Sequence, residues 1–313
     1  MIIVSFFSYK GGSGRSTTAW NTSYFLGKKL NASPKSPLII IDMDIDSAGM
    51  TILLNAHQKK DKFTVQKMMA MQDEQANDVS RMLLPDISDE KAKEEQFKRH
   101  PFFSRLTPVG SMFGLERESV LLFPADISLN GSFTFPDDIE KMFGKIVSLC
   151  NKMGCCGIVF DTPSGSQVAA SISLGQSGAT VCCMRPTYQF RVGTAQYLID
   201  SFNAEKDFHF ILCPTAVSKD KVQLEGINLP DDLRYLIKNS VLDKIDERHR
   251  KNVNEKMVSN EMSILGIPEV ALFKWEECCL GMKTQREPDE ELAVKCYQYL
   301  ADLVLEQCEK NAK

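Results

Sequence analysis

The sequence lacks the features that mark several common classes of protein. Among its 313 residues there are only four histidines, and no apolar run approaches the roughly 18 residues that a membrane-spanning helix needs. The apolar start of the chain runs straight into a polar loop, without the pattern of a secretory signal peptide. A net charge of −4 gives no overall attraction to nucleic acid or anionic lipid. We therefore expect a cytoplasmic protein with no transmembrane segment.

The ten cysteines do not form a recognisable metal or disulfide pattern. No C-x-x-C spacing occurs, although three pairs of cysteines are adjacent in the chain. Two of these pairs, Cys155-Cys156 and Cys182-Cys183, lie in or beside apolar segments typical of strands. Neighbouring residues of a strand point to opposite faces, so such pairs do not converge on one metal ion. We expect buried, reduced thiols, as in cytoplasmic proteins.

One glycine-rich stretch, residues 9–18, organises the rest of the chain. It follows an apolar segment over residues 2–7, typical of a buried strand, and precedes a helix that we expect over about residues 15–29. This is the context of a phosphate-binding loop, because glycines let backbone N–H groups approach an anion and the helix N-terminus adds partial positive charge. The predicted phosphate-binding residues are Gly11, Gly12, Ser13, Gly14, Arg15, Ser16 and Thr17.

The loop is similar to the deviant Walker A motif, K-G-G-x-G-K-[ST]-T, of the ParA/MinD family of ATPases, and departs from it only at Arg15. The resemblance implies that Lys10 reaches across a dimer interface to the phosphates of the partner's nucleotide. It also implies that Ser16 binds magnesium and that Thr17 contacts the phosphates. Arginine, which some members of the superfamily carry here, offers a planar fork instead of a compact ammonium. We expect nucleotide binding, while the rate of hydrolysis stays open.

A group of carboxylates follows the next expected strand, residues 38–41. Asp42, Asp44 and Asp46 alternate there, and ligands of open α/β sheets lie beyond the carboxyl ends of strands. ParA/MinD proteins have a D-x-D segment at this place. By that resemblance Asp42 lies near the magnesium ion and Asp44 orients the attacking water, which makes Asp44 a candidate catalytic residue beside Lys10. The role of Asp46 stays open, because the residues after Asp44 differ from those of many relatives.

A third motif is an apolar strand that ends in Asp161 and continues into a turn ending in Gly165. This is a Walker B arrangement. The resemblance implies that Asp161 holds a magnesium-bound water and that the N–H of Gly165 senses the γ-phosphate. A further apolar segment, residues 208–213, is followed by Pro214 and Thr215, where relatives contact the base of the nucleotide.

These segments predict one α/β domain over residues 1–313, a three-layer P-loop fold. We expect a mostly parallel sheet of seven or eight strands with helices on both faces. Further strands are expected over residues 120–125, 179–184 and 266–273. Further helices are expected over about residues 136–153, 188–202, 231–261 and from 288 onward. Residues 58–119, which contain a charge run, read as an insertion of helices and loops within the domain.

Two expected helical segments bear on possible membrane and DNA partners, and the first is the last helix of the chain. It has an apolar stripe made of Leu292, Cys296, Tyr299, Leu300 and Leu303. Its polar face is acidic, unlike the basic membrane-targeting helix that ends MinD-type proteins, so we expect it to pack on the domain. Basic and acidic residues are mixed over residues 231–261, which gives DNA binding only weak support.

The resemblance as a whole implies a Mg²⁺-dependent ATPase that forms a homodimer around ATP, hydrolyses it slowly and acts as a spatial or regulatory switch with a protein partner. The alternative, favoured by Arg15, is a nucleotide-gated scaffold that binds ATP with little or no hydrolysis. A metal-cluster carrier and a tyrosine kinase of the same superfamily are disfavoured by the missing C-x-x-C spacing and by the absence of a tyrosine cluster in the tail. The cargo does not follow from the sequence.

Overall fold

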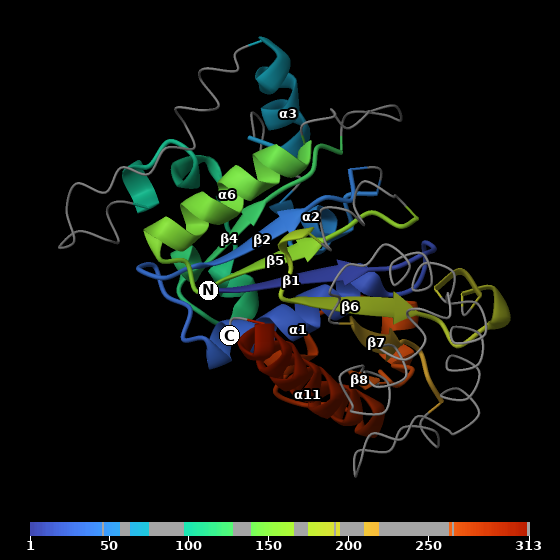
Figure 1. Ribbon diagram of the computed structural model, residues 1–313. Helices are drawn as coiled ribbons and strands as arrows, with labels where there is room; N and C mark the ends of the chain where they lie inside the picture. Colours follow the sequence, from blue (N-terminus) through green and yellow to red (C-terminus); the bar gives the residue numbers. More distant parts are fainter. Residues whose placement is uncertain are drawn as a thin grey trace.

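The structure is a computed structural model. It describes residues 1–45, 47–56, 63–74, 97–127, 139–165, 175–190, 192–194, 210–218, 263–264 and 266–311. Its described strands form one eight-stranded sheet in the order β3-β4-β2-β5-β1-β6-β7-β8 (Figure 1). All pairings are parallel except that of β3 with β4. The predicted α/β fold, with a mostly parallel sheet and helices on both faces, is confirmed.

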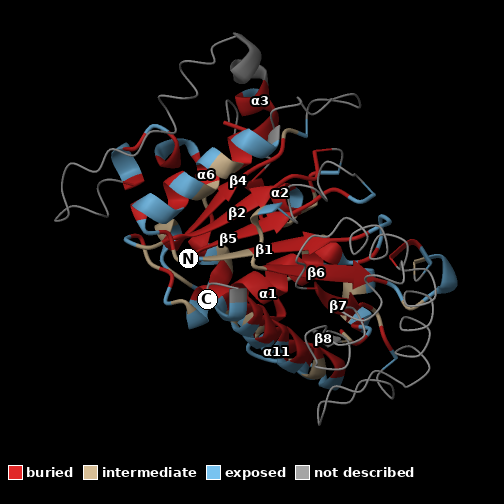
Figure 2. Cartoon of the chain, in the orientation of Figure 1, coloured by how far each residue is buried: buried red, intermediate tan, exposed pale blue. Residues whose placement is uncertain are grey.

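The strands arise from short apolar segments, and β2, β4, β5, β6 and β7 are buried along their whole length (Figure 2). The strands are β1 (Ile2–Phe7), β2 (Leu38–Asp42), β3 (Thr107–Pro108), β4 (Val120–Phe123), β5 (Gly157–Asp161), β6 (Ala179–Met184), β7 (Phe210–Pro214) and β8 (Ser263–Ile264). The α-helices are α1 (Arg15–Lys29), α2 (Gly49–Leu53), α3 (Val65–Glu74), α6 (Ile139–Met153) and α11 (Pro288–Asn311). Short 3-10 turns are η3 (Phe103–Arg105), η4 (Gly110–Phe113), η5 (Arg117–Ser119), η7 (Ala271–Lys274) and η8 (Leu280–Met282).

Alternate side chains of the strands pack into two different layers. Leu38 and Ile40 of β2 lie in a core shared with α1 and α11, whereas Ile39 and Ile41 lie in a core shared with α6. Successive residues of a strand point to opposite faces, so an unbroken apolar run requires cover on both sides. Accordingly α6 covers one face of the sheet, and α1 with α11 covers the other (Figure 1).

The strand order brings the three sequence motifs together. Strands β2, β5 and β1 are neighbours, and Asp42 at the end of β2 pairs in register with Asp161 at the end of β5. Strands β5 and β2 lie on one side of β1 in the sheet, whereas β6 lies on the other side of β1. Such a reversal of strand order opens a crevice at the carboxyl edge of the sheet, where ligands bind.

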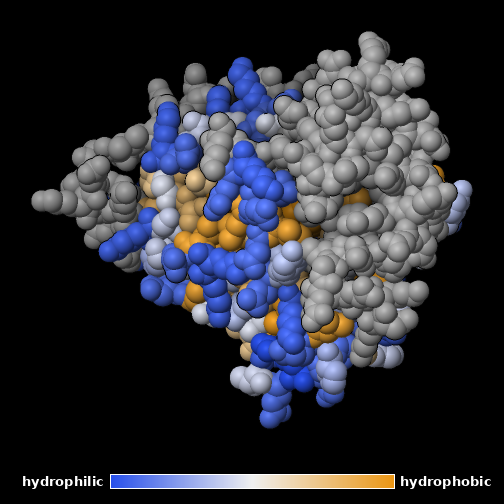
Figure 3. All heavy atoms as spheres, turned by 60° about the horizontal axis from the view of Figure 1, so that its bottom comes forward, coloured by the Kyte–Doolittle hydropathy of each residue, from blue (hydrophilic) through white to orange (hydrophobic). Residues whose placement is uncertain are grey.

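The C-terminal helix α11 packs on the domain, as predicted. Its buried side chains in the core shared with α1 and the sheet include Ala293, Cys296, Tyr297, Leu300, Ala301 and Val304. The prediction placed Tyr299 in this stripe, but that residue is 41% exposed. At about 100° per residue Tyr299 lies at the rim of a face centred on Leu300. Figure 3 shows hydrophilic side chains around a patch of hydrophobic ones on the described surface of the molecule in this view.

Two segments differ from the sequence predictions. The expected strand over residues 266–273 is wrong: only Pro268 forms an isolated bridge, and a 3-10 turn follows. Backbone bonds flank this proline, since Ile267 accepts the N–H of Val217 and Glu269 donates to the carbonyl of Val217, but the pairing ends at Glu269. Residues 97–119, expected as helices and loops, include the antiparallel edge strand β3. They also bury Phe97, Phe102 and Phe103 in the core beneath α6.

Several predictions fall outside the described residues. They are those on Asp46, on residues 86–95, on most of residues 188–202 and on residues 231–261. Residues 188–190 and 192–194 of the expected helix are helical. All ten cysteines are free, and eight of them are buried. Within the described part of the chain, no helix is long and apolar enough to cross a membrane.

Candidate nucleotide-binding site

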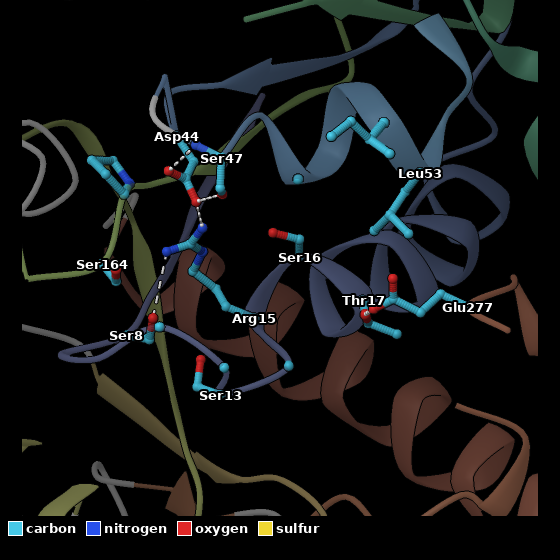
Figure 4. Close-up of a pocket in the computed structure, with 16 residues that line it drawn as sticks. Ser8, Ser13, Arg15, Ser16, Thr17, Asp44, Ser47, Leu53, Ser164 and Glu277 are labelled. Carbon is cyan, nitrogen blue, oxygen red and sulfur yellow. Dashed lines mark hydrogen bonds and ion pairs between the residues drawn. The ribbon is translucent and has the colours of Figure 1, made fainter. Parts of the chain in front are cut away.

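The phosphate loop is shaped by two glycines. Gly12 and Gly14 have φ angles of 75° and 72°, a left-handed conformation that other residues rarely adopt. Helix α1 begins directly after them, and no side chain caps its N-terminus. The first N–H groups of the helix therefore point to a cavity of about 430 Å³ (Figure 4). All seven predicted phosphate-binding residues, from Gly11 to Thr17, line this cavity.

Arg15 does not extend into solvent but bridges two strands. Its Nη2 donates to Oδ2 of Asp44 at 2.5 Å, and its Nε donates to Oδ1 of Asp161 at 2.7 Å. A longer bond of 3.4 Å joins Nη1 to the hydroxyl of Ser8. Burial disfavours the charged guanidinium, but the two carboxylates outweigh it and raise the pKa of Arg15. One permanent cation thus compensates two buried acids.

Asp44 lies in the cavity wall and is held in place from two sides. Besides Arg15, the hydroxyl of Ser47 donates to its Oδ2, and the Ser47 N–H lies 3.3 Å from its Oδ1 (Figure 4). The carboxylate is therefore fixed at the mouth of the loop. Asp44 thus lines the same cavity as the phosphate loop, while its predicted role in orienting water stays a prediction; its bond to Arg15 was not foreseen from the sequence.

Asp42, which the resemblance places near the magnesium ion, lies next to Asp161 at the ends of the paired strands β2 and β5. It is fully buried and does not line the cavity, since its Oδ2 accepts bonds of 2.7 Å from both the N–H and the hydroxyl of Thr51. Burial, with the neighbouring charge of Asp161, raises the pKa of Asp42 to about 8. In this structure Asp42 ties the end of β2 to α2, so it shapes the turn that presents Asp44.

Asp161 and Ser16 fit a magnesium site. Oδ2 of Asp161 is buried and has no partner in hydrogen-bonding geometry among the described residues. Burial raises the pKa of Asp161, against the opposing effects of Arg15 and the Ser16 side chain. Magnesium prefers oxygen ligands and keeps several waters besides one or two carboxylates and substrate phosphates. No group of three or more His, Cys, Asp or Glu side chains is arranged as a metal site within the described ranges.

Lys10 and Gly165, the other predicted phosphate contacts, do not line the cavity. The Nζ of Lys10 donates to Oε1 of Gln189 at 2.9 Å and lies 5.8 Å from the ring centroid of Phe190. The N–H of Gly165 donates to the carbonyl of Ser8 at 3.2 Å. Lys10 is exposed beside the loop, and Gly165 braces the strand that leads into it.

A second cavity, of about 320 Å³, adjoins the first on the side of β7. Thr215, one of the predicted base contacts, lines it together with Ala216, Pro268 and the buried Tyr297, whereas Pro214 does not. The two cavities share Gly12, Ser13, Gly14, Thr17 and Glu277. The two cavities therefore adjoin along the phosphate loop.

No known protein-family profile matches the sequence, and no curated protein matches it. Solved structures do match. The cell division ATPase MinD of Pyrococcus furiosus is 17% identical over 97% of this chain and 98% of its own, with a TM-score of 0.55. MinD of Aquifex aeolicus, in the MinC:MinD complex, is 15% identical over 96% of each chain, with a TM-score of 0.59. The McdA–ATP complex of Cyanothece is 14% identical over 98% of this chain and 96% of its own, with a TM-score of 0.54. The chain has the MinD fold.

Three residues that support the site within this MinD fold were not singled out from the sequence. Arg185 donates from Nε to the carbonyl of Gly12 at 2.8 Å, and Ser47 bonds to Asp44. Glu277 accepts a bond of 2.6 Å from the hydroxyl of Thr17. None of the three belongs to a recognisable motif. Only the folded chain brings them to the loop, from the segments after β6, β2 and η7.

Proposed function

We propose that this chain is a Mg²⁺-dependent ATPase that dimerises around ATP, hydrolyses it slowly and acts as a switch in positioning or regulation. The observation that carries the proposal is the uncapped loop from Gly11 to Thr17, which shares its cavity with Asp44 at the reversal point of the sheet. The similar structures support it, because they include a cell division ATPase and an ATP complex.

The cleft suits a nucleoside triphosphate. Its phosphates bind over the loop in the larger cavity, and its base binds in the adjoining cavity beside Thr215 and Ala216. Ser16 and Asp161 would hold a magnesium ion together with waters and phosphate oxygens. A metal ion held there would supply positive charge beside the phosphates. The preference for adenine rests on the resemblance to ParA/MinD proteins.

The place of Lys10 supports the proposed dimer. This side chain is exposed beside the loop and does not line its own cavity, which leaves it available to a nucleotide on a second subunit. Its present partners, Gln189 and the Phe190 ring, are both neutral, so exchanging them for phosphate oxygens gains a charge–charge attraction. Each subunit therefore completes the site of the other in a symmetric dimer.

A second candidate function is a scaffold that binds ATP and scarcely hydrolyses it. The ion pair between Arg15 and Asp44 favours this candidate, because a carboxylate held by a guanidinium is a poor acceptor for a proton from water. In the ATPase, by contrast, Arg15 moves toward the phosphates and frees Asp44 to orient the water. Both candidates bind nucleotide and dimerise, and turnover distinguishes them.

The decisive experiment is light scattering of the wild type and of Asp44→Asn with no nucleotide, with Mg²⁺–ADP and with Mg²⁺–ATP. The asparagine keeps the size of the side chain and one oxygen acceptor. A dimer that forms only with Mg²⁺–ATP supports the switch. A molecular mass that nucleotide does not change, in protein shown by calorimetry to bind ATP, would sink the dimer mechanism.

Phosphate release is measured on the same proteins. Release above background that Asp44→Asn abolishes supports the ATPase. ATP-dependent dimers without measurable release support the scaffold. Melting curves of both proteins must first show that the variant is folded, because the substitution also removes a buried ion-pair partner of Arg15.

A further inference from the structure

Glu277 stands at the junction of the two cavities. Of the five residues that line both, it is the only one with a charged side chain. Its Oε1 accepts the hydroxyl of Thr17 at 2.6 Å, so the carboxylate lies against the first turn of α1 (Figure 4). Nothing in the sequence motifs or in the proposed hydrolysis accounts for an acid at this point.

The position of Glu277 is set by a buried amide. Asn21 on α1 is fully buried, and its Nδ2 donates to the carbonyl of Cys278 at 3.1 Å. Its Oδ1 accepts the N–H of Leu280 at 2.8 Å. These two bonds pin the segment that follows Glu277 onto the helix. The carboxylate is therefore presented to the cleft by a fixed backbone and is not carried there by a loose loop.

A ribose joins the phosphates of a nucleotide to its base, so in this cleft it lies at the junction of the cavities. Its 2′- and 3′-hydroxyls are donors, and an ionised carboxylate is an acceptor with room for several bonds. We propose that Glu277 recognises the ribose by accepting hydrogen bonds from these hydroxyls, which makes the site selective for ribonucleotides over 2′-deoxyribonucleotides. This inference rests on the proposed nucleotide function.

A carboxylate next to Thr17 also repels phosphate, and this effect must be separated from ribose recognition. Repulsion acts equally on ATP and 2′-deoxy-ATP, because both carry the same phosphates. Ribose recognition acts on the ratio of their affinities. A hydrogen bond to a charged group changes binding by about tenfold or more. The ratio therefore isolates the role of Glu277 whatever its effect on overall affinity.

The experiment is calorimetric titration of ATP and 2′-deoxy-ATP into the full chain with Mg²⁺, for the wild type, Glu277→Ala and Glu277→Gln. Glu276→Ala is the matched control, since it removes a neighbouring exposed carboxylate that lines neither cavity. We expect the wild type and the control to bind ATP about tenfold or more tightly than 2′-deoxy-ATP. In Glu277→Ala this ratio should fall to about one, and in Glu277→Gln it should shrink.

Two results would overturn the inference: equal affinity of the wild type for both nucleotides, or a ratio that survives in Glu277→Ala. An equal gain in affinity for both nucleotides in Glu277→Ala, with no change in their ratio, assigns the residue to phosphate repulsion alone and also overturns it. Failure of the wild type to bind any nucleotide is a different outcome, because it contradicts the proposed function itself.

Discussion

Arg15 and Asp44 form a buried ion pair in which Nη2 lies 2.5 Å from Oδ2. The same guanidinium bonds through Nε to Asp161, so one side chain joins the carboxyl ends of β2 and β5. The two acids are those that the resemblance to ParA/MinD proteins connects with water and magnesium. In this chain the loop cation therefore also controls the charge of the proposed catalytic centre.

Removing Arg15 should destabilise the fold strongly. Arg15→Ala leaves Asp44 and Asp161 buried without their cation, which costs about 3–5 kcal/mol. Urea unfolding at neutral pH measures this loss. The control is Lys29→Ala, which removes a half-exposed pair with Asp302 and should cost at most about 1 kcal/mol. Similar losses for the two variants would mean that the Arg15 network contributes little to stability.

The stability of the protein should fall as the pH rises between about 4 and about 8. Burial and the charge of Asp161 raise the pKa of Asp42 to about 8, well above its value of about 3.9 in an unfolded chain. Over this window the folded state binds more protons than the unfolded state, so the free energy of unfolding decreases with rising pH. The raised pKa of Asp161 acts in the same direction.

The variant Asp42→Asn cannot ionise and should flatten this dependence. Urea unfolding at several pH values, in buffer without divalent cations, compares its slope with that of the wild type. The Thr51 bonds can persist on the amide oxygen, which keeps the turn in place. An unchanged slope in Asp42→Asn would show that another group carries the pH dependence.

Adding one methyl group at Gly49 should weaken the magnesium dependence of nucleotide binding. A Cβ at Gly49 would lie 2.6 Å from Oγ and 3.2 Å from Cβ of Ser16, so the serine must shift. Misplacing a residue of a metal site costs roughly 10- to 100-fold in metal affinity. We expect the gain in ATP affinity on adding Mg²⁺ to shrink by about tenfold in Gly49→Ala.

Calorimetric titration of ATP with and without Mg²⁺ makes this measurement. Gly144→Ala is the control, since its Cβ would meet only Gln176 at an ordinary 3.6 Å, on a helix away from the cleft. ATP affinity without Mg²⁺ should stay nearly constant in both variants. If Mg²⁺ raises the ATP affinity of Gly49→Ala as much as that of the wild type, the assignment of Ser16 to the magnesium site is wrong.

Lys10→Ala should abolish ATP-induced dimerisation while leaving ATP binding by the monomer nearly unchanged. The reason is that Lys10 is exposed and does not line its own cavity, so its loss acts on the partner's site. Light scattering with Mg²⁺–ATP measures the mass, and calorimetry measures the affinity. Lys35→Ala serves as the matched control, because this exposed lysine lies before the amino end of β2, whereas the phosphate loop follows the carboxyl end of β1. Dimers of normal strength in Lys10→Ala would exclude a cross-subunit role.

The strands and the phosphate loop could be predicted from the sequence because each is encoded by a short run of consecutive residues. Unbroken apolar runs predict parallel strands covered on both faces, and β1, β2, β5 and β6 appear where they were expected. The phosphate loop could be recognised because its glycines and the helix start that follows are encoded in ten consecutive residues. The strand expected over residues 266–273 was wrong, because whether an apolar segment forms a strand also depends on the neighbouring strand with which it pairs.

The sequence by itself determined the α/β class, the phosphate loop and the acids that accompany it, since each depends on spacing within a short segment. Only the tertiary structure decided what those residues touch. It bonds Arg15 to Asp44, turns Asp42 away from the cavity toward Thr51, and brings Glu277 to Thr17 from 260 positions away. Pairings of this kind arise from strand order and helix packing, because residues far apart in the chain meet only when the layers assemble.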